Sequence, residues 1–324
     1  MITNSRIALG DRLGAQMNTL AELVFLAHEN QQELVLYDEL RQFRRGYEFL
    51  EVFDVERRIR LINQSGKLKN HMIRLYCRQF SRQSKSVGNW KRIYQSRLSN
   101  QVDRLVYKWI TLSYPSFNRI NKKVNQIHCD ESLLQLSHGN FDISSGLGTY
   151  QDWKKYGDEM MSLFSFKPEI EEAGQKSLSE IQKKSHDLTE NPLLVSIHIR
   201  LGDYLILSSL NLDASYYQKA IQYFDASNTV FIIFSDEIEK CREMIQPLGI
   251  KSIYVEGNSA AVDMYLMSRC DSNIIANSTY SFWGAFLNPN PEKKVICPHD
   301  FIGQSSKENL YINGNYYPDD WIAI

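Results

Sequence analysis

The stretch LLVSIHIRLGDY, residues 193–204, decides the fold. It opens with an apolar run of the kind found in strands that are buried on both faces of a parallel sheet. The run ends in His198, Arg200 and Asp203, which supply an imidazole, a guanidinium and a carboxylate. Open α/β sheets bind their ligands beyond the carboxyl ends of parallel strands. The stretch therefore predicts a buried strand with a binding site at its end.

The same pattern continues through the second half of the chain. Four further apolar strands, separated by helical segments, are predicted at residues 229–236, 252–256, 272–278 and 293–298. At the other end, a strand at 6–9, a helix from about residue 11 and a strand at 34–39 predict a β-turn-α-β unit. This alternation is typical of the α/β class, with a doubly wound parallel sheet in the second half. The Asn191-Pro192 pair is the expected boundary between the halves.

The composition narrows the class of protein. A hydrophobic fraction of 43% with 23% charged residues is that of a globular chain. No apolar run approaches the ~18 residues of a membrane span, and no secretory leader precedes the first predicted strand. The five cysteines are scattered, which favours reduced thiols and a cytoplasmic location. The seven histidines lack ligand spacing, so no metal site is predicted.

One segment is strongly basic although the whole chain has a net charge of −1. Residues 56–123 hold 17 Lys and Arg against two acids, interleaved with apolar residues at helical spacing. The pattern predicts a helical insert at about 55–125. It fits a solvated helix face, or a surface that docks on anionic lipid through Trp90 and Trp109. A nucleic-acid-binding protein without transferase activity is the third interpretation. An isoelectric point near 6.7 and the lack of a nucleic-acid motif speak against it.

Polar residues also follow two of the other predicted strands. Ser235 and Asp236 end one strand, and Ser278 and Thr279 open a helix after another. The free N–H groups of a helix start favour an anion, so Arg200 and this helix start are expected to clamp a phosphate. A dinucleotide-dependent oxidoreductase is disfavoured because GDRLGA, residues 10–15, lacks the spacing of G-x-G-x-x-G.

Each of these residues also has a structural interpretation. Arg200 fits a surface ion pair, and Asp203 fits a helix cap or the partner of Arg200. Ser278 fits a helix N-cap. Asp263 interrupts the apolar helix AAVDMYLM and fits a solvent-facing acid, while His198 fits a core histidine.

Several motifs together resemble the α-1,2-fucosyltransferase family. They are HIRLGDY, FSDE, DRLGAQMNTLAEL and DMYLMSRCDSNIIANSTYSFWGAFL. The resemblance implies a GT-B-like fold of two Rossmann-like domains, here 1–190 on the acceptor side and 191–324 on the donor side with a C-terminal tail. It also implies inverting transfer of L-fucose from GDP-fucose to an acceptor hydroxyl, without metal or other cofactor.

The resemblance further implies roles for particular residues. Arg200 should hold the β-phosphate with help from Ser278 and Thr279, and His198 and Asp263 should recognise the guanine. Asp203 and Ser235 are expected to contact the donor as well. The acceptor is expected to be a glycan, α-1,2 to galactose in an O-antigen unit. If it is lipid-linked, the enzyme would attach peripherally to the inner face of the cytoplasmic membrane.

This chain departs from the family motifs at two positions. Leu201 replaces a second arginine, and Ala15 replaces an asparagine. Arg12 is the expected second cation for the phosphate. Asp11 is the candidate base for the acceptor hydroxyl, with a helix cap beside Arg12 as the structural alternative. These departures leave another GDP-linked deoxysugar, such as colitose, open as the donor.

Overall fold

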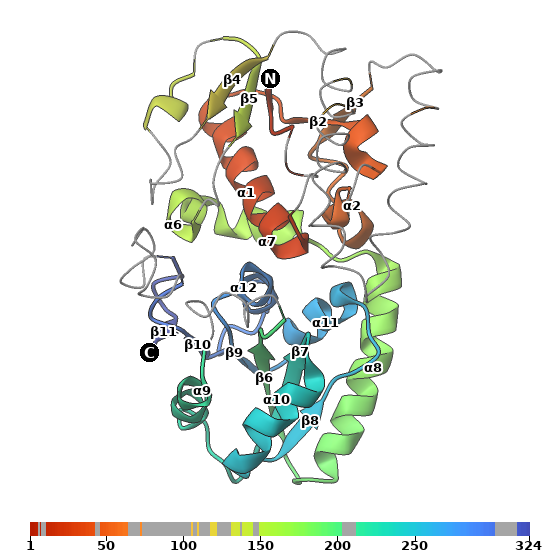
Figure 1. Cartoon of the computed structure of the whole chain (residues 1–324), viewed down its shortest axis with the longest axis vertical. Helices are drawn as coiled ribbons and strands as arrows, with labels where there is room; N and C mark the ends of the chain where they lie inside the picture. Colours follow the sequence, from red (N-terminus) through yellow and green to blue (C-terminus); the bar gives the residue numbers. More distant parts are fainter. Residues whose placement is uncertain are drawn as a thin grey trace. The chain divides into compact units, whose positions relative to one another are not determined.

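The computed structural model shows a chain of two compact units, each an α/β structure (Figure 1). The described residues are 1–5, 7, 11–42, 46–63, 72, 105, 109, 117–121, 131–136, 138–144, 149–202, 212–301 and 316–324. The first unit comprises Met1–Glu51 and Val55–Gly148, and the second comprises Val52–Asp54 and Thr149–Ile324.

The described strands and helices alternate along both units. The strands are β1 (Ile2–Thr3), β2 (Val35–Tyr37), β3 (Arg60–Ile62), β4 (Asn118–Asn121), β5 (Phe141–Ser144), β6 (Leu193–Ile199), β7 (Thr229–Ser235), β8 (Ser252–Tyr254), β9 (Ser272–Ile274), β10 (Val295–Cys297) and β11 (Ile322–Ala323). The helices are α1 (Leu13–Glu29), α2 (Glu48–Val52), α6 (Tyr150–Trp153), α7 (Gly157–Leu163), α8 (Pro168–His186), α9 (Ala214–Ile221), α10 (Ile238–Ile245), α11 (Ala260–Met267) and α12 (Thr279–Phe286). Short 3-10 turns lie at Asp38–Gln42, Glu131–Leu133, Lys154–Tyr156 and Gln246–Leu248.

The first unit contains parallel strand pairs, and helix α1 packs against β1. One sheet has the order β1-β5-β4, β2 pairs with β3, and a bridge between Ile2 and Leu34 connects the two sets. The first described strand is β1, four residues before the predicted strand at 6–9; of that range only Ile7 is described, and it lies in a turn. The chain also turns at Ser5, whose N–H and hydroxyl both donate to the Asp142 carboxylate at 2.9 and 2.6 Å. The predicted helix after it and the strand at 34–39 are confirmed as α1 and β2.

The basic insert begins with a strand where a helix was predicted. β3 pairs in parallel with β2, and the Arg60 N–H donates to the Leu34 carbonyl at 3.2 Å. Its pairing with a buried strand therefore overrides the helical spacing of the apolar residues. Farther on, Met72, Leu105 and Trp109 are helical. The rest of the predicted insert up to residue 116 lies outside the described residues.

The second unit is built on one parallel sheet of six strands. Its order is β11-β10-β9-β6-β7-β8, so the five predicted strands are confirmed. The first strand of the unit, β6, lies between β7 and β9, and the strand order reverses there. In doubly wound sheets this switch point opens the crevice where ligands bind. The carboxyl ends of β6 and β9 are therefore the expected walls of a site.

The tail of the chain returns to this same sheet. β11 pairs in parallel with β10 and adds the sixth strand. Phe301 stacks on Tyr316 with ring centroids 3.8 Å apart, and Trp321 contacts Phe282 of α12. The tail therefore belongs to the second unit and packs against α12.

Apolar residues on both faces of the sheet form the core of the second unit. Val195, Ile197 and Ile199 of β6 are fully buried, because helices cover the sheet on either side. Helix α8 runs along α11 at one side of the unit (Figure 1). These contacts group residues 149–190 with the second unit, whereas the predicted boundary was Asn191. The assignment of acceptor and donor domains stays a prediction.

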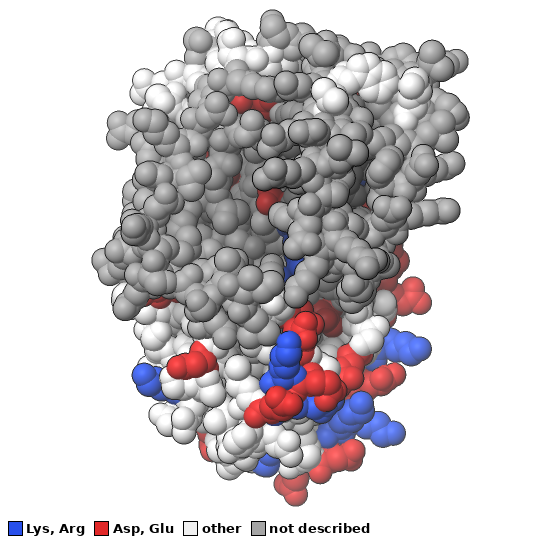
Figure 2. Space-filling model, viewed as in Figure 1, with Lys and Arg blue, Asp and Glu red and all other residues white. Residues whose placement is uncertain are grey.

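Charged side chains of both signs are mixed on the visible face of the second unit (Figure 2). On α10, Lys240 pairs with Glu237 at 3.4 Å and Arg242 with Glu239 at 3.7 Å. Such exposed pairs contribute at most about 1 kcal/mol each. Within the described residues, no helix is long and apolar enough to span a bilayer.

Candidate functional site

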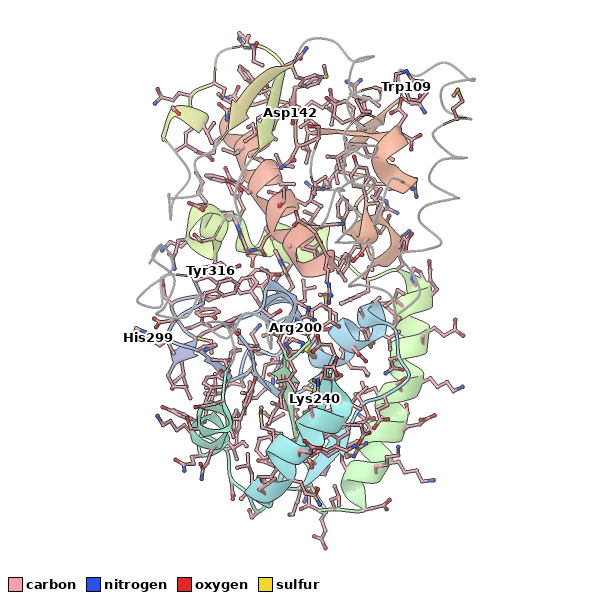
Figure 3. The ribbon with its side chains drawn as sticks, viewed as in Figure 1. Trp109, Asp142, Arg200, Lys240, His299 and Tyr316 are labelled. Carbon is pink, nitrogen blue, oxygen red and sulfur yellow. The ribbon has the colours of Figure 1, made fainter. Side chains whose placement is uncertain are left out.

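An ion pair marks the carboxyl end of β6. The guanidinium Nη1 of Arg200 lies 2.8 Å from Oδ2 of Asp236, the residue directly after β7. The side chains are 14% and 26% exposed, so the pair is largely shielded from water. Figure 3 shows Arg200 close to helices α11 and α12 of the same unit. The predicted ion pair thus exists, but it lies in a shielded position at the end of β6, the strand that borders the switch point of the sheet.

His198 lies two residues earlier on β6 and is buried at 4% exposure. Burial and, to a smaller extent, the Arg200 charge lower the pKa of His198 to about 4, against an opposing effect of Asp236. The imidazole is therefore neutral at physiological pH. Its Nδ1 has no hydrogen-bond partner among the described residues, and its ring lies 5.3 Å from that of Tyr280. A fully satisfied core histidine is not what the structure contains.

Asp263 lies in the first turn of α11, a helix whose start is capped by the Ser259 hydroxyl. Burial raises the pKa of Asp263 to about 6, and a hydrogen bond from the Asn258 side chain partly offsets the shift. Its Oδ1 is buried and lacks a hydrogen-bond partner within the described residues. Asp263 is half-buried, with one carboxylate oxygen shielded, and is thus not a fully solvent-facing acid. A shielded carboxylate with an unused acceptor is suited to bind a donor group of a ligand.

Tyr280, in the first turn of α12, connects these residues, although it was not among the predicted site residues. Its hydroxyl donates to the Ala260 carbonyl of α11 at 2.5 Å. Burial raises the pKa of Tyr280 well above its usual value; the charge of Asp263 adds to the shift and that of Arg200 opposes it. The phenol therefore lies within the electrostatic field of both groups. β6, α11 and α12 bring an arginine, a neutral histidine and a shielded acid together.

The start of α12 supplies hydroxyl and backbone groups. Ser278 occupies the N-cap position and is 7% exposed, yet its hydroxyl makes no capping hydrogen bond within the described part of the chain. Thr279 is the first residue of the helix. Because the first N–H groups of a helix lack intrahelical acceptors, this start remains suited to an anion.

The other predicted residues of the second unit have different surroundings. The Ser235 hydroxyl accepts from the Glu237 N–H at 3.2 Å and so supports the turn into α10. Leu201, which replaces the family's second arginine, is 2% exposed and part of the apolar core. Asp203 lies outside the described residues. Among the described residues, no three His, Cys, Asp or Glu side chains gather in a group that could hold a metal ion.

Asp11 and Arg12 are exposed residues of the first unit that precede α1. Arg12 occupies the N-cap position without a capping bond from its side chain, and the Leu13 N–H donates to the Glu48 carboxylate at 2.8 Å. The Asp11 carbonyl accepts from the Gln16 amide at 3.0 Å. Glu48 thus binds the first N–H of the helix, and both the catalytic and the capping role of Asp11 stay predictions.

The sequence of the second unit matches a known family. The model of glycosyl transferase family 11 matches residues 115–324. The chain belongs to this family. The resemblance predicted from the motifs is therefore confirmed, and the family match includes β6, α11 and α12, which carry the candidate site.

Two bacterial relatives are similar to part of this chain. The O-antigen biosynthesis glycosyltransferase WbnK of Escherichia coli is 38% identical over 150 residues, 42% of this chain and 46% of that protein. The alpha-1,2-colitosyltransferase of Escherichia coli is 41% identical over 140 residues, 40% of this chain and 47% of that protein. The matched stretches thus cover a little under half of each relative.

A solved structure supports the fold over most of the chain. The crystal structure of POFUT1 in its apo form matches with a TM-score of 0.51, covering 91% of this chain and 96% of that one. With 13% sequence identity, the match shows that the fold is shared and goes no further.

Proposed function

We propose that this chain is an inverting, metal-independent glycosyltransferase. It transfers L-fucose, or a related deoxysugar such as colitose, from a GDP-linked donor to a hydroxyl of a glycan. The observation that carries the proposal is the shielded Arg200–Asp236 pair at the carboxyl end of β6, the strand that borders the switch point of the parallel sheet. The relatives are consistent with this chemistry, since one is named as an O-antigen glycosyltransferase and the other as an α-1,2-colitosyltransferase.

Arg200 has the chemistry needed at the leaving group. When the bond between the anomeric carbon and the β-phosphate oxygen breaks, the electron pair stays with that oxygen and GDP departs. A fixed guanidinium and the helix-start groups at Ser278 and Thr279 would stabilise this charge without a metal. Loss of one such preorganised donor typically lowers the rate by about 10²–10³.

Asp263 is suited to recognise guanine, with the neutral His198 as a second contact. Guanine presents a ring N–H and an amino group side by side, which a carboxylate can accept together. Adenine lacks the ring N–H, so the acid would favour GDP-sugars over ADP-sugars. Sites built on such polar pairs discriminate by roughly 10⁴.

The first unit would supply the acceptor side of the reaction. Asp11 is the proposed base, taking the proton from the acceptor hydroxyl as its oxygen attacks the anomeric carbon. Arg12, Asp203 and Ser235 stay predictions as further donor contacts. The proposed acceptor is a galactose-containing oligosaccharide, met at the inner face of the cytoplasmic membrane when it is lipid-linked.

A donor screen tests the proposal directly. The purified chain is incubated with GDP-fucose, GDP-colitose or UDP-galactose and a galactose-terminated acceptor, and the product is identified by mass spectrometry and its anomeric configuration by NMR. We expect transfer from a GDP-deoxysugar alone, unaffected by EDTA. The Arg200→Ala variant is expected to lose about 10²–10³ in turnover, whereas Arg242→Ala on α10 serves as the matched arginine control. Transfer from the UDP-sugar, or full activity of Arg200→Ala, would contradict the proposal.

A further inference from the structure

Asp236 joins the Arg200 side chain to the backbone that follows β6. Its Oδ2 accepts the guanidinium at 2.8 Å. Its Oδ1 accepts the N–H of Leu201 at 3.0 Å and that of Gly202 at 3.3 Å. One carboxylate therefore holds a cation and the turn that carries it.

The sheet register explains why these two residues meet. β6 and β7 are parallel, and their last paired residues are Ile199 and Ser235. Arg200 and Asp236 are the next residues on the two strands, so they emerge side by side at the same edge. A free arginine side chain samples many rotamers, and the pairing removes much of this freedom before any ligand arrives.

Gly202 allows the carboxylate to lie against the turn. A Cβ atom at this position would be 2.4 Å from Oδ2 of Asp236, the oxygen that holds Arg200. Any side chain at Gly202 would therefore displace the carboxylate from the guanidinium. The glycine is required here by close approach.

An acid at this edge of the sheet is unfavourable for anion binding, so its presence there needs another explanation. Asp236 partly neutralises the cation proposed to bind a phosphate, and it would repel the phosphate directly. Its hydrogen bonds to the backbone and to Arg200 provide that explanation. They hold the guanidinium in place, and a preorganised cation needs no reorganisation during the reaction.

We propose that Asp236 is a positioning residue, which fixes the Arg200 guanidinium for the β-phosphate of the donor without touching the donor itself. This inference rests on the proposed function of the same site. The competing possibility is that the ion pair blocks the site and must break for the donor to bind. The two possibilities predict opposite effects when the pair is removed.

The Asp236→Asn variant separates them, because the amide oxygen still accepts the two backbone N–H groups while the charge is lost. The affinities for GDP and GMP are measured by calorimetry. Their ratio isolates the β-phosphate, which GMP lacks. We expect the wild-type chain to favour GDP strongly, Arg200→Ala to abolish the preference, and Asp236→Asn to reduce it about tenfold with the GMP affinity unchanged. Glu239→Gln, which neutralises an exposed acid on α10, should leave the ratio at its wild-type value.

A second variant tests the same inference if Asp236→Asn does not fold. Gly202→Ala retains the charge but displaces the carboxylate, and it should reduce the ratio by a similar factor. In turnover assays both variants should lower kcat about tenfold and leave the KM for the acceptor unchanged. A purely structural role would weaken GDP and GMP binding equally.

The outcomes also separate this inference from the proposed function. Equal wild-type affinities for GDP and GMP would overturn the phosphate role of Arg200 and with it the proposed function. A strong wild-type preference that Arg200→Ala abolishes but Asp236→Asn retains would overturn the positioning role alone. Tighter GDP binding by Asp236→Asn would establish the blocking role in its place.

Discussion

Burial of the Asp263 carboxyl group has opposite consequences for folding and for binding. The shielded position raises its pKa from 3.8 to about 6, chiefly through desolvation. The folded state therefore binds the proton more tightly than the unfolded chain does. The free energy of unfolding falls as pH rises from about 4 to about 6, and the ionised group destabilises the fold above that window.

The Asp263→Asn variant is expected to be more stable than the wild-type chain at pH 7.5. One pKa unit corresponds to about 1.4 kcal/mol, so removing the charge should raise the free energy of unfolding by on the order of 2 kcal/mol. The same variant should lose most of its GDP affinity. Urea unfolding and calorimetry measure both. A less stable variant would show that the carboxylate has stabilising partners in the folded state.

GDP binding is expected to depend on pH through the same group. The ionised Asp263 accepts the guanine N–H groups, so the affinity should fall about tenfold per pH unit well below pH 6 and stay constant above about pH 7. His198, with a pKa of about 4, stays neutral over this range. Calorimetry between pH 5 and 8 gives the profile, with Asp225→Asn as a control on an exposed acid. A flat wild-type profile would exclude Asp263 as the recognition group.

The helices that form the site depend on close packing at their contacts. α8 approaches α11 at Gly174, where a Cβ atom would lie 2.2 Å from Cδ1 of Tyr265. Tyr265 is 2% exposed and contacts Phe166 with ring centroids 5.3 Å apart, so its ring has little room to move. The place of α11, and hence of Asp263, depends on this glycine.

The Gly174→Ala variant is therefore expected to be destabilised. Alanine favours a helix by up to about 1 kcal/mol over glycine, but overpacking of a buried contact typically costs 1–3 kcal/mol, and the overpacking should dominate. We expect a melting temperature several degrees lower, measured by differential scanning calorimetry. Gly157→Ala in α7 is the matched control, because nothing lies within 4 Å of its added Cβ. Equal melting temperatures for the two variants would show that α8 can shift to accommodate the added methyl group without loss of stability.

Element by element, the sequence was most informative where the strands are long and apolar. The strands β6 and β7 are seven residues each and were predictable from hydrophobicity alone. β4 reads Asn-Arg-Ile-Asn and β11 has only two residues, so neither carries a pattern that distinguishes a strand. Their pairing is determined by distant partners, β5 and β10.

At the scale of the whole molecule, the uneven charge is the feature that its net value of −1 conceals. Residues 56–123 contain 17 basic residues and only two acids. Each basic residue near an anionic bilayer contributes about 1 kcal/mol, so a group of them can hold a protein at a membrane.

We expect the full chain to sediment with anionic vesicles of phosphatidylglycerol and to stay in solution with phosphatidylcholine vesicles. Replacing Lys91, Arg92 and Arg97 by glutamine should weaken this binding about 100-fold, because three charges are removed. The matched control replaces three lysines of α8, Lys176, Lys183 and Lys184, by glutamine. The basic segment would be excluded as the membrane contact if the chain bound both lipids equally, or if only the α8 variant lost binding.

The sequence by itself determined the α/β class, the strand that ends in Arg200, and the family to which the chain belongs. These depend on local patterns of apolar and polar residues, which do not require knowledge of distant contacts. Only the tertiary structure revealed that Asp236 holds Arg200, that Tyr280 lies within the field of both Arg200 and Asp263, and that the Asp263 carboxylate is shielded. The physical reason is that these properties arise between residues far apart in the chain, brought together by strand order and helix packing.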